Sequence, residues 1–574
     1  MEEGEHMRYH ALACDYDGTI AEHGTVSQEL IAALERLRAT GRMLILVTGR
    51  RLGDLLNVFP HVTLFDRVVA ENGALLYHPA TYEERTIGEP PPQEFVDMLR
   101  ERGVSPSVGR VIVATWEPHQ TTVIQAIRDL GLEMQVIFNK GAVMVLPSGV
   151  NKATGLKYAL YDLELSFHNI VGVGDAENDH AFLSLCECSV AVADALPAIK
   201  KNADLVTEGA RGAGVIELID RMAATDLIEL EPRLTRHGLK IGTREDGGEV
   251  RVSPYGNNIL VSGASGSGKS TFAAGFMEQL ARKKYQFCII DPEGDYEGLE
   301  GAVVVGSSKS APIVEGGIRL LERYDQNVVL NLLGIPLADR PGFFREFLPR
   351  LQELRTRTGR PHWIVLDEAH HLAPLNMDIS SFAFCRDLYG FMMITVHPAH
   401  VAPYFLSSAQ LLIVVGEDPE YVFTDFSKIT GQAVPQAPVR RLEPGEAVAW
   451  FRQTSEELFK FRTIASHAAH RRHLRKYADG MLSPDKSFYF RGPEGKLNLR
   501  AHNLMLFVQI ADGVDDDTWL YHLGRGDFSC WLRLSIKDDV LASYAERIEN
   551  MSIPPRESRA LIREAIEERY TAPA

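Results

Sequence analysis

Residues 11–19 read ALACDYDGT, an apolar run that ends in two aspartates and a glycine. The run has the length of a buried strand, and a helical pattern follows at residues 30–37. Asp15 and Asp17 are therefore expected at the carboxyl end of a strand, where ligands bind in open parallel α/β sheets. Two carboxylates that are two residues apart in a turn point in different directions, so one can attack phosphorus while the other moves a proton.

Two further apolar runs end in polar residues at the same kind of position. Residues 43–50 read MLILVTGR, and residues 170–179 read IVGVGDAEND. A single Asp-Gly pair after a strand is usually only a turn. Here three predicted strands bring an acid, a hydroxyl and an acid to one edge of a sheet. This pattern favours a catalytic site over three unrelated turns.

The order of these segments resembles that of the haloacid-dehalogenase superfamily of phosphohydrolases. The four motifs of that superfamily are matched by residues 15–19, Thr48, Lys152 and residues 174–179. The segments ENGA at 71–74 and NKATGL at 151–156 narrow the resemblance to a subgroup of Cof-type, sucrose-phosphate and archaeal-type phosphoglycolate phosphatases. The resemblance implies a Rossmann-like phosphatase domain in the N-terminal part of the chain.

The resemblance also implies a role for each matched residue. Asp15 is the expected nucleophile that forms an aspartyl-phosphate, and Asp17 is the expected general acid and then general base. Thr48 and Lys152 would hold the phosphate oxygens, with a surface lysine near a helix start as the alternative for Lys152. Phosphoryl transfer needs neutralisation of charge, so Mg²⁺ is the expected cofactor. Its expected ligands are Asp15, the Asp17 carbonyl, Asp175 and Asp179.

The segment from about residue 78 to 148 differs in its pattern of residues from the segments on either side. Prolines at 90–92 precede a predicted helix at residues 94–102, and strands and a further helix are predicted up to residue 146. This order resembles the small α/β cap that the subgroup inserts between its second and third motifs. Such a cap closes over the site and contacts the leaving group. Its size favours a small phosphate ester or nucleotide over a protein substrate.

A second chemical site is predicted in the middle of the chain. Residues 259–271 read ILVSGASGSGKST, a complete Walker A loop between a strand and a helix. The glycines let backbone N–H groups surround phosphates at a helix N-terminus, and the lysine and the following serine reach the terminal phosphates and Mg²⁺. The expected ATP-binding residues are Gly263, Ser265, Gly266, Ser267, Gly268, Lys269, Ser270 and Thr271.

Further strand ends complete this second site. The apolar run 363–366 ends in Asp367, expected to act on Mg²⁺, and Glu368, expected to polarise the attacking water, although adjacent acids are often only solvated. Residues 291–296 read DPEGDY, and another apolar run leads into His397. The set resembles the HerA and FtsK branch of ring-forming ATPases. That branch usually carries Gln at the sensor position that His397 occupies here, which is a departure from the pattern.

Residues 439–476 are locally basic. A ring ATPase needs a positive group donated by the neighbouring subunit, and this segment could supply an arginine finger. The alternative is a solvated helix face over residues 467–476. The sequence favours no single residue among Arg440, Arg441, Arg452, Lys460, Arg462, Arg471, Arg472, Arg475 and Lys476.

The sequence thus predicts an α/β protein with two Rossmann-like, three-layer α/β domains, the first with a small inserted α/β cap, and a C-terminal helical module. Helices are expected at residues 497–511, 517–550 and 556–570, and the aromatic residues between 519 and 531 favour a packed core. The expected domains are the phosphohydrolase at 1–224, the HerA-like ATPase at 225–466 and a helical interaction module at 467–574.

Composition narrows the class of protein. The net charge of −17 at pH 7 argues against a chain that coats nucleic acid, although one basic face could bind it. Six scattered cysteines fit neither a disulfide framework nor a zinc site. No apolar run reaches the roughly 18 residues of a membrane span, and the N-terminus has no signal-peptide core. A cytoplasmic protein without membrane contact is expected.

Three functional hypotheses remain open. The first couples a Mg²⁺-dependent phosphatase to an ATPase whose partners are further copies of the chain in a ring, such as a hexamer. The second is a machine that translocates or processes DNA, for example in defence against phage, with the phosphatase trimming terminal phosphates or nucleotides. In the third, ATP binding only regulates the phosphatase. Resemblance of folds does not decide among them, because function belongs to the sites.

Overall fold

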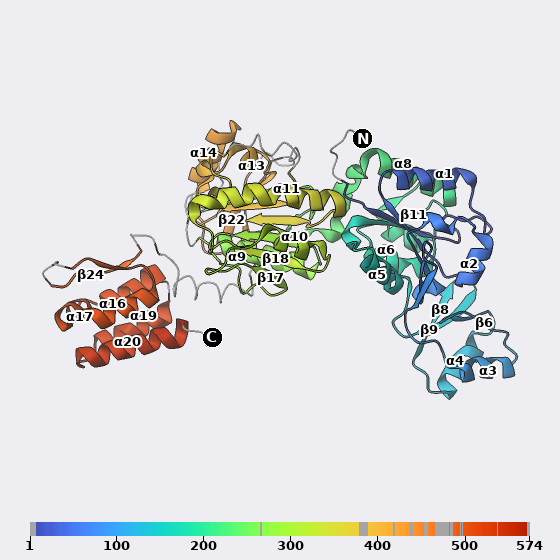
Figure 1. Cartoon of the computed structure of the whole chain (residues 1–574), viewed down its shortest axis with the longest axis horizontal. Coiled ribbons are helices and arrows are strands. Elements are labelled where there is room, and N and C mark those ends of the chain that lie inside the picture. Colours follow the sequence, from blue (N-terminus) through green and yellow to red (C-terminus); the bar gives the residue numbers. More distant parts are fainter. Residues whose placement is uncertain are drawn as a thin grey trace. The chain divides into compact units, whose positions relative to one another are not determined.

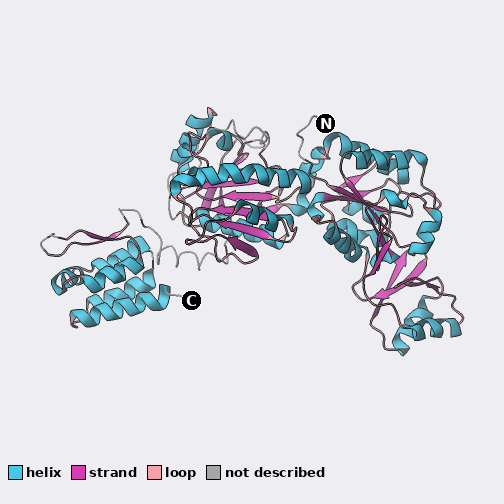
Figure 2. Cartoon of the chain, viewed as in Figure 1, coloured by secondary structure: helices cyan, strands magenta, loops and turns pink. Residues whose placement is uncertain are grey.

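The computed structural model describes residues 7–139, 141–264, 267–377, 388–416, 419–435, 441–452, 457–464, 466, 482, 486–493, 495, 497–536 and 538–570. The chain forms two compact units, the first running to Ile464 and the second comprising the C-terminal segment with Ser270–Gly275 and Glu293–Glu300. Two large sheets and a smaller one lie in the first unit, and helices dominate the second (Figures 1 and 2). The predicted fold class is confirmed. No described helix is long and apolar enough to cross a membrane.

The first large sheet has the strand order β12-β11-β10-β1-β2-β3-β4-β5. The central strand β1 (Ala11–Asp15) is fully buried and pairs in parallel with β2 (Met43–Val47) and β10 (Ile170–Gly174). All three therefore end at one level of the sheet. The remaining strands are β3 (Arg67–Ala70), β4 (Leu75–His78), β5 (Glu83–Thr86), β11 (Cys188–Ala191) and β12 (Leu205–Val206).

Helices cover both faces of this sheet (Figure 1). α1 (Gln28–Ala39) packs with α8 (Arg211–Thr225) on one face, and α5 (Lys152–Asp162) packs with α6 (His180–Leu185) on the other. α1 begins at Ser27, whose hydroxyl accepts a hydrogen bond from Leu30 N, and it buries apolar residues at helical spacing. Two short helices, α2 (Leu52–Val58) and α7 (Pro197–Asn202), complete the layers.

An antiparallel sheet of order β6-β7-β9-β8 forms the cap. Its strands are β6 (Ser107–Val108), β7 (Val113–Trp116), β8 (Met134–Asn139) and β9 (Ala142–Pro147). Helices α3 (Gln93–Glu101) and α4 (Gln120–Asp129) pack against this sheet around an apolar core of its own. Strand β5 lies inside the segment expected for the cap, but it pairs with β4 and extends the large sheet. The elements of the cap therefore run from α3 to β9.

The second large sheet has the order β14-β13-β23-β22-β21-β15-β20-β19-β16-β18-β17. In its parallel part, β15 (Ile259–Ser262) lies between β21 (Leu411–Val415) and β20 (Phe391–Thr395), and β19 (Trp363–Leu366) lies between β20 and β16 (Phe287–Asp291). β18 (Asn327–Asn331) and β17 (Ala302–Val305) follow. The helices are α9 (Lys269–Arg282), α10 (Val314–Glu322), α11 (Arg340–Thr358), α12 (Ala369–Leu372), α13 (Pro403–Ser407) and α14 (Pro419–Thr430).

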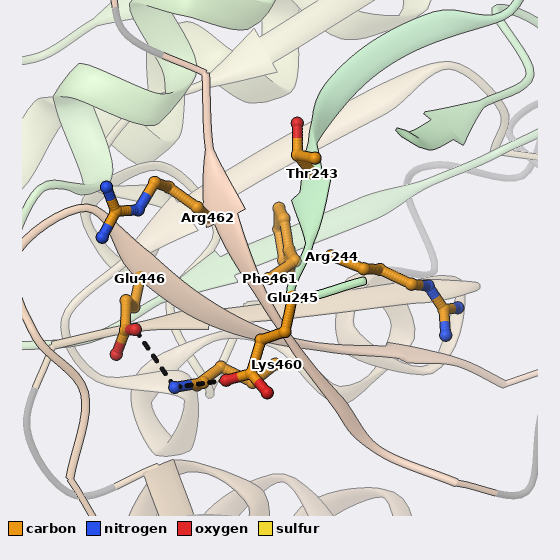
Figure 3. Close-up of a pocket in the computed structure, with 7 residues that line it drawn as sticks. All are labelled: Thr243, Arg244, Glu245, Glu446, Lys460, Phe461 and Arg462. Carbon is orange, nitrogen blue, oxygen red and sulfur yellow. Dashed lines mark hydrogen bonds and ion pairs between the residues drawn. The ribbon is translucent and has the colours of Figure 1, made fainter. Parts of the chain in front are cut away.

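Antiparallel strands extend one edge of this sheet: β13 (Leu239–Arg244), β14 (Glu249–Val252), β22 (Glu446–Phe451) and β23 (Phe459–Thr463). A charged pocket of about 320 Å³ lies over β13, β22 and β23 (Figure 3). Lys460 bridges Glu245 at 2.7 Å and Glu446 at 3.1 Å across it. Arg244 and Arg462 line the same pocket, so several charges gather at this strand edge.

The two large sheets meet at the amino ends of their strands. Asn169 directly precedes β10 and His362 directly precedes β19, and His362 Nε2 lies 3.2 Å from Asn169 Oδ1. Arg360 donates to the Glu164 carbonyl at 2.8 Å across the same boundary. Because β10 and β19 both run away from this junction, the carboxyl ends of the two sheets face in opposite directions.

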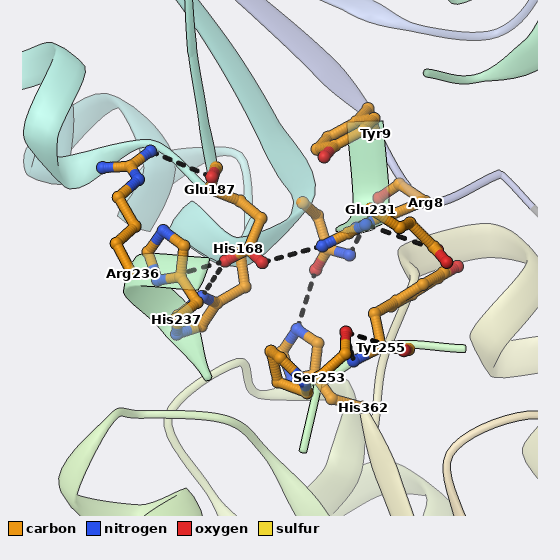
Figure 4. Close-up of polar contacts among 12 residues, drawn as sticks. Arg8, Tyr9, His168, Glu187, Glu231, Arg236, His237, Ser253, Tyr255 and His362 are labelled. Carbon is orange, nitrogen blue, oxygen red and sulfur yellow. Dashed lines mark hydrogen bonds and ion pairs between the residues drawn. The ribbon is translucent and has the colours of Figure 1, made fainter. Parts of the chain in front are cut away.

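A buried carboxylate organises the polar network of the junction (Figure 4). Glu187 accepts hydrogen bonds from Arg8 at 2.8 Å, His168 Nδ1 at 2.6 Å and the Tyr285 hydroxyl at 3.0 Å. Burial alone would raise the pKa of Glu187, but the hydrogen bond from His168 and the charges of His168, His237 and Arg8 hold it well below its usual range. His168 Nε2 lies 2.7 Å from the Lys283 carbonyl. Both ring nitrogens of His168 thus have a hydrogen-bond partner, one on each side of the junction.

The second unit is a helical module with a two-stranded sheet. The expected helix at 497–511 instead begins with a strand, and the expected helix at 517–550 is interrupted near Gly526, which adopts a left-handed φ of 70° at the start of a new helix. The aromatic side chains form a packed core, in which Trp519 stacks on Phe528 at 4.4 Å between ring centres. Its elements are β24 (Phe488–Phe490), β25 (Leu499–Ala501), α16 (Leu504–Gly513), α17 (Asp516–Leu523), α18 (Asp527–Trp531), α19 (Asp539–Glu549) and α20 (Pro555–Tyr570).

The Glu187→Gln variant is expected to lose about 3–5 kcal/mol of unfolding free energy at pH 7, because it removes the fully buried carboxylate at 2.8 Å from the Arg8 guanidinium and leaves only the longer contact with Glu231 at 3.5 Å. The pKa of folded Glu187 lies below the unfolded value of about 4.3. The stabilisation is therefore present above that pH and is lost as the pH falls through the folded pKa. Urea unfolding measures the change. In a matched control, Asp220→Asn removes the exposed pair with Arg36 and should cost at most about 1 kcal/mol; equal losses would contradict this assignment.

Candidate active sites

A buried lysine joins two carboxylates at the carboxyl end of β1. Lys152 begins α5 and places Nζ 2.5 Å from Asp15 Oδ1 and 2.6 Å from Asp179 Oδ1. Each of the three side chains is at most 5% exposed. Asn151 caps α5 by accepting from Thr154 N, which fixes where the helix, and so Lys152, begins. Lys152 is therefore not a surface lysine.

Three carboxylates gather around this lysine. Oxygens of Asp15, Asp175 and Asp179 lie within 4.8 Å of one another. Burial and the charge of Asp179 raise the pKa of Asp15 to about 8, against the lowering effect of Lys152. One ammonium would not balance three ionised carboxylates, and their clustered oxygens fit a divalent cation that prefers oxygen ligands. Asp179 Oδ2 also accepts from the backbone N–H groups of Asp175 and Ala176, at 2.9 Å each, and thereby shapes the loop.

Asp17 and Thr48 lie beside the cluster, as the strand ends predict. Asp17 forms a two-pronged ion pair with Arg50, at 2.7 Å to Nε and 2.6 Å to Nη2. Its side chain is 46% exposed, unlike that of Asp15. Thr48 is buried at the end of β2, and its hydroxyl oxygen accepts from Arg50 N at 3.1 Å. The structure thus brings together the six residues that the phosphatase motifs predict, at the ends of three strands and the start of one helix.

The sequence interpretation missed two side chains at this edge. Arg50 holds Asp17, and its position next to Thr48 and Gly49 was the available signal. Thr19 donates to Asp175 at 3.4 Å, and only its place at the end of the first motif pointed to it. Neither contact could be assigned from spacing, because each joins two separate loops.

The glycine-rich loop follows β15 and leads into α9, as predicted. Lys269 Nζ donates to the carbonyls of Gly263 at 2.9 Å and Ala264 at 3.0 Å, so the lysine lies under its own loop. Gly263 has φ 154°, and a Cβ there would lie 2.0 Å from the Val415 carbonyl oxygen. Only glycine therefore fits at the start of the loop. The predicted residues Ser265 and Gly266 lie outside the described residues.

Asp367 and Glu368 follow β19, one strand removed from β15. Glu368 has the left-handed angles φ 41° and ψ 55°, a strain that proteins keep mainly at functional sites. Its Oε2 lies 3.5 Å from His370 Nδ1, which is also 3.0 Å from Thr395 Oγ1. Burial, together with the charges of neighbouring histidines and Lys269, lowers the pKa of His370 to about 4, so the ring is neutral at pH 7. His370 is a contact of Glu368 that the sequence interpretation missed.

His397 lies at the end of β20, where a sensor residue was predicted. Its backbone N–H donates to Thr395 Oγ1 at 3.1 Å, and its ring centre lies 6.0 Å from that of His370. Burial and the charges of His400 and Lys269 lower its pKa, which places His397 in the electrostatic field of the loop lysine. A neutral imidazole at this position can donate or accept a hydrogen bond, as the expected glutamine would.

The basic segment is only partly described. Arg452 donates to the carbonyls of Ser407, at 3.1 Å, and Ala409, so it is held by its own chain. Lys460 is held by the two glutamates of the charged pocket. Arg462 lines that pocket. Arg440, Arg471, Arg472, Arg475 and Lys476 lie outside the described residues.

Comparison with known proteins identifies the family of the N-terminal domain. Residues 12–119 and 107–219 match the family model of haloacid dehalogenase-like hydrolases. Over 220 residues the chain is 32% identical to a phosphoglycolate phosphatase of Methanothermobacter thermautotrophicus, which covers 97% of that protein and 37% of this chain. This chain belongs to the haloacid dehalogenase-like hydrolase family. A second relative, phosphoglycolate phosphatase 2 of Saccharolobus solfataricus, is 30% identical over 219 residues, which are 91% of its length and 37% of this chain.

The haloacid dehalogenase-like hydrolase accounts for only part of the chain. A solved hydrolase of this kind from Bacteroides thetaiotaomicron, 17% identical with a TM-score of 0.34, covers 37% of the chain and 99% of its own. Residues 240–354 match the family model of the helicase HerA central domain. That match includes the glycine-rich loop and ends before Asp367. The hydrolase is thus fused to a segment similar to a HerA central domain, as the sequence predicted.

Without nucleotide, Mg²⁺ at about 100 times its Kd is expected to stabilise the hydrolase domain by about 2.7 kcal/mol. Asp175→Asn should lose most of this stabilisation, because it removes one of the clustered carboxylates. Thermal unfolding with and without MgCl₂ measures the difference. Asp54→Asn, which breaks an exposed pair with Arg51, is the control and should respond to Mg²⁺ like the wild type. A full Mg²⁺ response in Asp175→Asn would contradict the metal assignment.

Proposed function

We propose that the N-terminal domain is a Mg²⁺-dependent phosphatase for a small phosphate ester, with phosphoglycolate as the first candidate. The observation that carries the proposal is the buried contact of Lys152 with Asp15 and Asp179 at the end of β1. The substrate class is supported by the relatives named phosphoglycolate phosphatase, which are matched over nearly their whole length. A small inserted cap is consistent with a small leaving group.

Each residue has a defined step in the proposed reaction. Asp15 attacks the phosphorus atom and forms an aspartyl-phosphate, while the bond to the leaving oxygen breaks. Asp17 gives its proton to that oxygen and then takes a proton from the water that hydrolyses the intermediate. Thr48 and Lys152 hold the phosphate oxygens. Mg²⁺, held by Asp15, the Asp17 carbonyl and Asp175 with Asp179 beside them, would supply positive charge for the transferring group.

The ion pair between Asp17 and Arg50 bears on the timing of this reaction. In the structure both carboxylate oxygens of Asp17 accept hydrogen bonds from Arg50, so neither is free to contact a leaving group. We therefore expect Asp17 to leave Arg50 before it protonates the leaving group. Substrate binding beside Thr48 is the step at which this exchange would occur.

We further propose that the HerA-like domain binds and hydrolyses ATP with Mg²⁺. Lys269 and the two residues that follow it, Ser270 and Thr271, would contact the phosphates and Mg²⁺. Asp367 would also interact with the Mg²⁺ ion. Glu368 would orient the attacking water, with His370 and His397 beside it. This proposal is supported by the family match over the loop and by the strand order, which puts β20 between the loop strand and the strand of Asp367.

A machine that moves or processes DNA is the second candidate function. The observation that favours it is the match of residues 240–354 to the central domain of a helicase. In that case the phosphatase would act on terminal phosphates or nucleotides that the motor exposes. A phosphatase substrate panel with and without ATP and DNA separates the two candidates, since only the second expects DNA to change the turnover.

The reciprocal variants Asp15→Asn and Lys269→Ala are expected to separate the two reactions. Asp15→Asn should lower hydrolysis of phosphoglycolate by at least about 10³-fold and leave ATP hydrolysis within about twofold, because the amide is a poor nucleophile and the sites are on separate sheets. Lys269→Ala should do the reverse. Steady-state assays of both activities on each variant make the measurement. Full phosphatase turnover in Asp15→Asn would refute the mechanism.

The protein is expected to assemble into a ring, such as a hexamer, in which an arginine of the basic segment 439–476 reaches the ATP of the neighbouring subunit. Arg462, which lines the charged pocket, is the first variant to test. A head-to-tail interface that closes on itself generates a ring. Arg462→Ala should lower ATP hydrolysis by about 10³-fold or more while ATP still binds, as for other donated arginines. Light scattering after size exclusion and ATPase assays test this, with the exposed Arg357→Ala as control. A monomer that hydrolyses ATP at full rate on dilution would exclude the ring.

A further inference from the structure

The segment 71–74 is a strained turn whose role the phosphatase motifs leave open. Glu71, Asn72 and Gly73 follow β3 with φ values of 52°, 54° and 103°, so three consecutive residues are left-handed. A Cβ at Gly73 would lie 1.9 Å from the Asn151 carbonyl oxygen, directly before Lys152. Proteins keep such strain where the surrounding structure holds it in place, mostly near functional sites.

The backbone of this turn is tied to the candidate active site. Glu71 N donates to the Arg50 carbonyl at 2.9 Å, and Asn72 N donates to the Thr48 carbonyl at 3.0 Å. The Asn72 side chain accepts from Asn178 Nδ2 at 3.1 Å. The turn thus contacts the segments that carry the second and fourth phosphatase motifs, and Gly73 packs against the third.

The Glu71 side chain points the other way, into the cap. Its Oε1 accepts from Arg110 N at 2.8 Å, and its Oε2 accepts from Val111 N at 2.8 Å and Ile112 N at 3.0 Å. Glu71 is 1% exposed. A Cβ at Gly109 would lie 2.5 Å from Glu71 Oε1, so the close approach depends on a glycine in the cap. One buried carboxylate therefore binds three consecutive amides between β6 and β7.

The cap is closed over the site in this structure. Strand β8 lies against the loop Glu177–Asp179, which carries the fourth motif. On β9, the Met144 sulfur lies close to the position of Gly49, next to Asn178 and Asn72. The apolar residues Val111 and Ile112 pack with Ala74 and Met144 in a small cluster beside the Glu71 contact. Glu71 thus holds the loop between β6 and β7, and this loop packs through Val111 and Ile112 in one cluster with Met144 of β9.

We propose that Glu71 is a positioning residue that holds the cap closed on the catalytic domain. The contact is separate from the two chain connections between domain and cap, so it can break while the chain connections persist. Glu71 does not touch the reacting atoms; it acts through the cap amides and the turn beneath them. The consequence for catalysis rests on the proposed phosphatase function, whereas the contact itself does not.

The test compares Glu71→Gln with Glu84→Gln. The amide of glutamine turns an N–H group toward the donors of the cap, so part of the carboxylate contact is lost. Glu84 is the matched control, because its exposed pair with Arg110, at 2.9 Å, reaches the same part of the cap. Steady-state kinetics on phosphoglycolate and hydrogen exchange of the amides of residues 110–112 are measured on full-length protein, with Glu71→Asp as a variant that keeps the charge.

Glu71→Gln is expected to raise KM about tenfold or more and to change kcat less than about threefold, because substrate binding must then also close the cap. Exchange at residues 110–112 should speed up in this variant and remain unchanged in Glu84→Gln. Glu71→Asp should fall between Glu71→Gln and the wild type, and it serves as the test if Glu71→Gln does not fold.

Kinetics and exchange in Glu71→Gln that match Glu84→Gln would overturn the proposal, as would faster exchange without a change in KM. A wild type that is inactive on every phosphate ester would instead refute the proposed function. In that case the exchange data alone would still decide whether Glu71 holds the cap.

Discussion

The ammonium of Lys152, between the carboxylates of Asp15 and Asp179, is the interaction on which the first domain depends. Taking these charges out of water is costly, and their attraction repays the cost only while the set stays complete. A buried ion cluster is therefore weak evidence for stability and better evidence for a site. It joins the end of β1, the start of α5 and the loop after β10, and the strained turn at 71–74 packs against the last two of these and against the end of β2.

The junction between the two large sheets imposes a second constraint. Because the sheets meet at the amino ends of β10 and β19, each candidate site opens on the side away from the other. The contacts that connect the two sheets at this junction include the network of Glu187 and His168 and the hydrogen bond from Arg360 to the Glu164 carbonyl. Both ring nitrogens of His168 have a hydrogen-bond partner, Glu187 on one side and the Lys283 carbonyl on the other. This pairing favours a rigid connection.

The family of the first domain and the proposed roles of its residues rest on different observations. Family membership makes the first domain a hydrolase, while the contacts of Asp15, Lys152 and Glu71 support the residue roles that we propose. For the second domain the match ends before Asp367, so the proposed ATPase chemistry depends more on the positions of Lys269 and Glu368 after β15 and β19, the two strands on either side of β20. The phosphatase site is thus supported by both family membership and side-chain contacts, whereas the proposed ATPase site is supported mainly by the arrangement of its residues at the strand ends.

The sequence by itself determined the positions of the strand ends and both chemical motifs, because an apolar run followed by acids, hydroxyls or glycines is a local signal. It missed the break in the C-terminal helix near Gly526 and the pairing of β5 with the large sheet, since both depend on packing. Only the tertiary structure decided which side chains meet. Asp17 and Arg50 are 33 residues apart, Glu71 and Arg110 are 39, and Arg8 and Glu187 are 179. Local pattern carries no information about such partners, because burial and charge select them only when distant segments pack together.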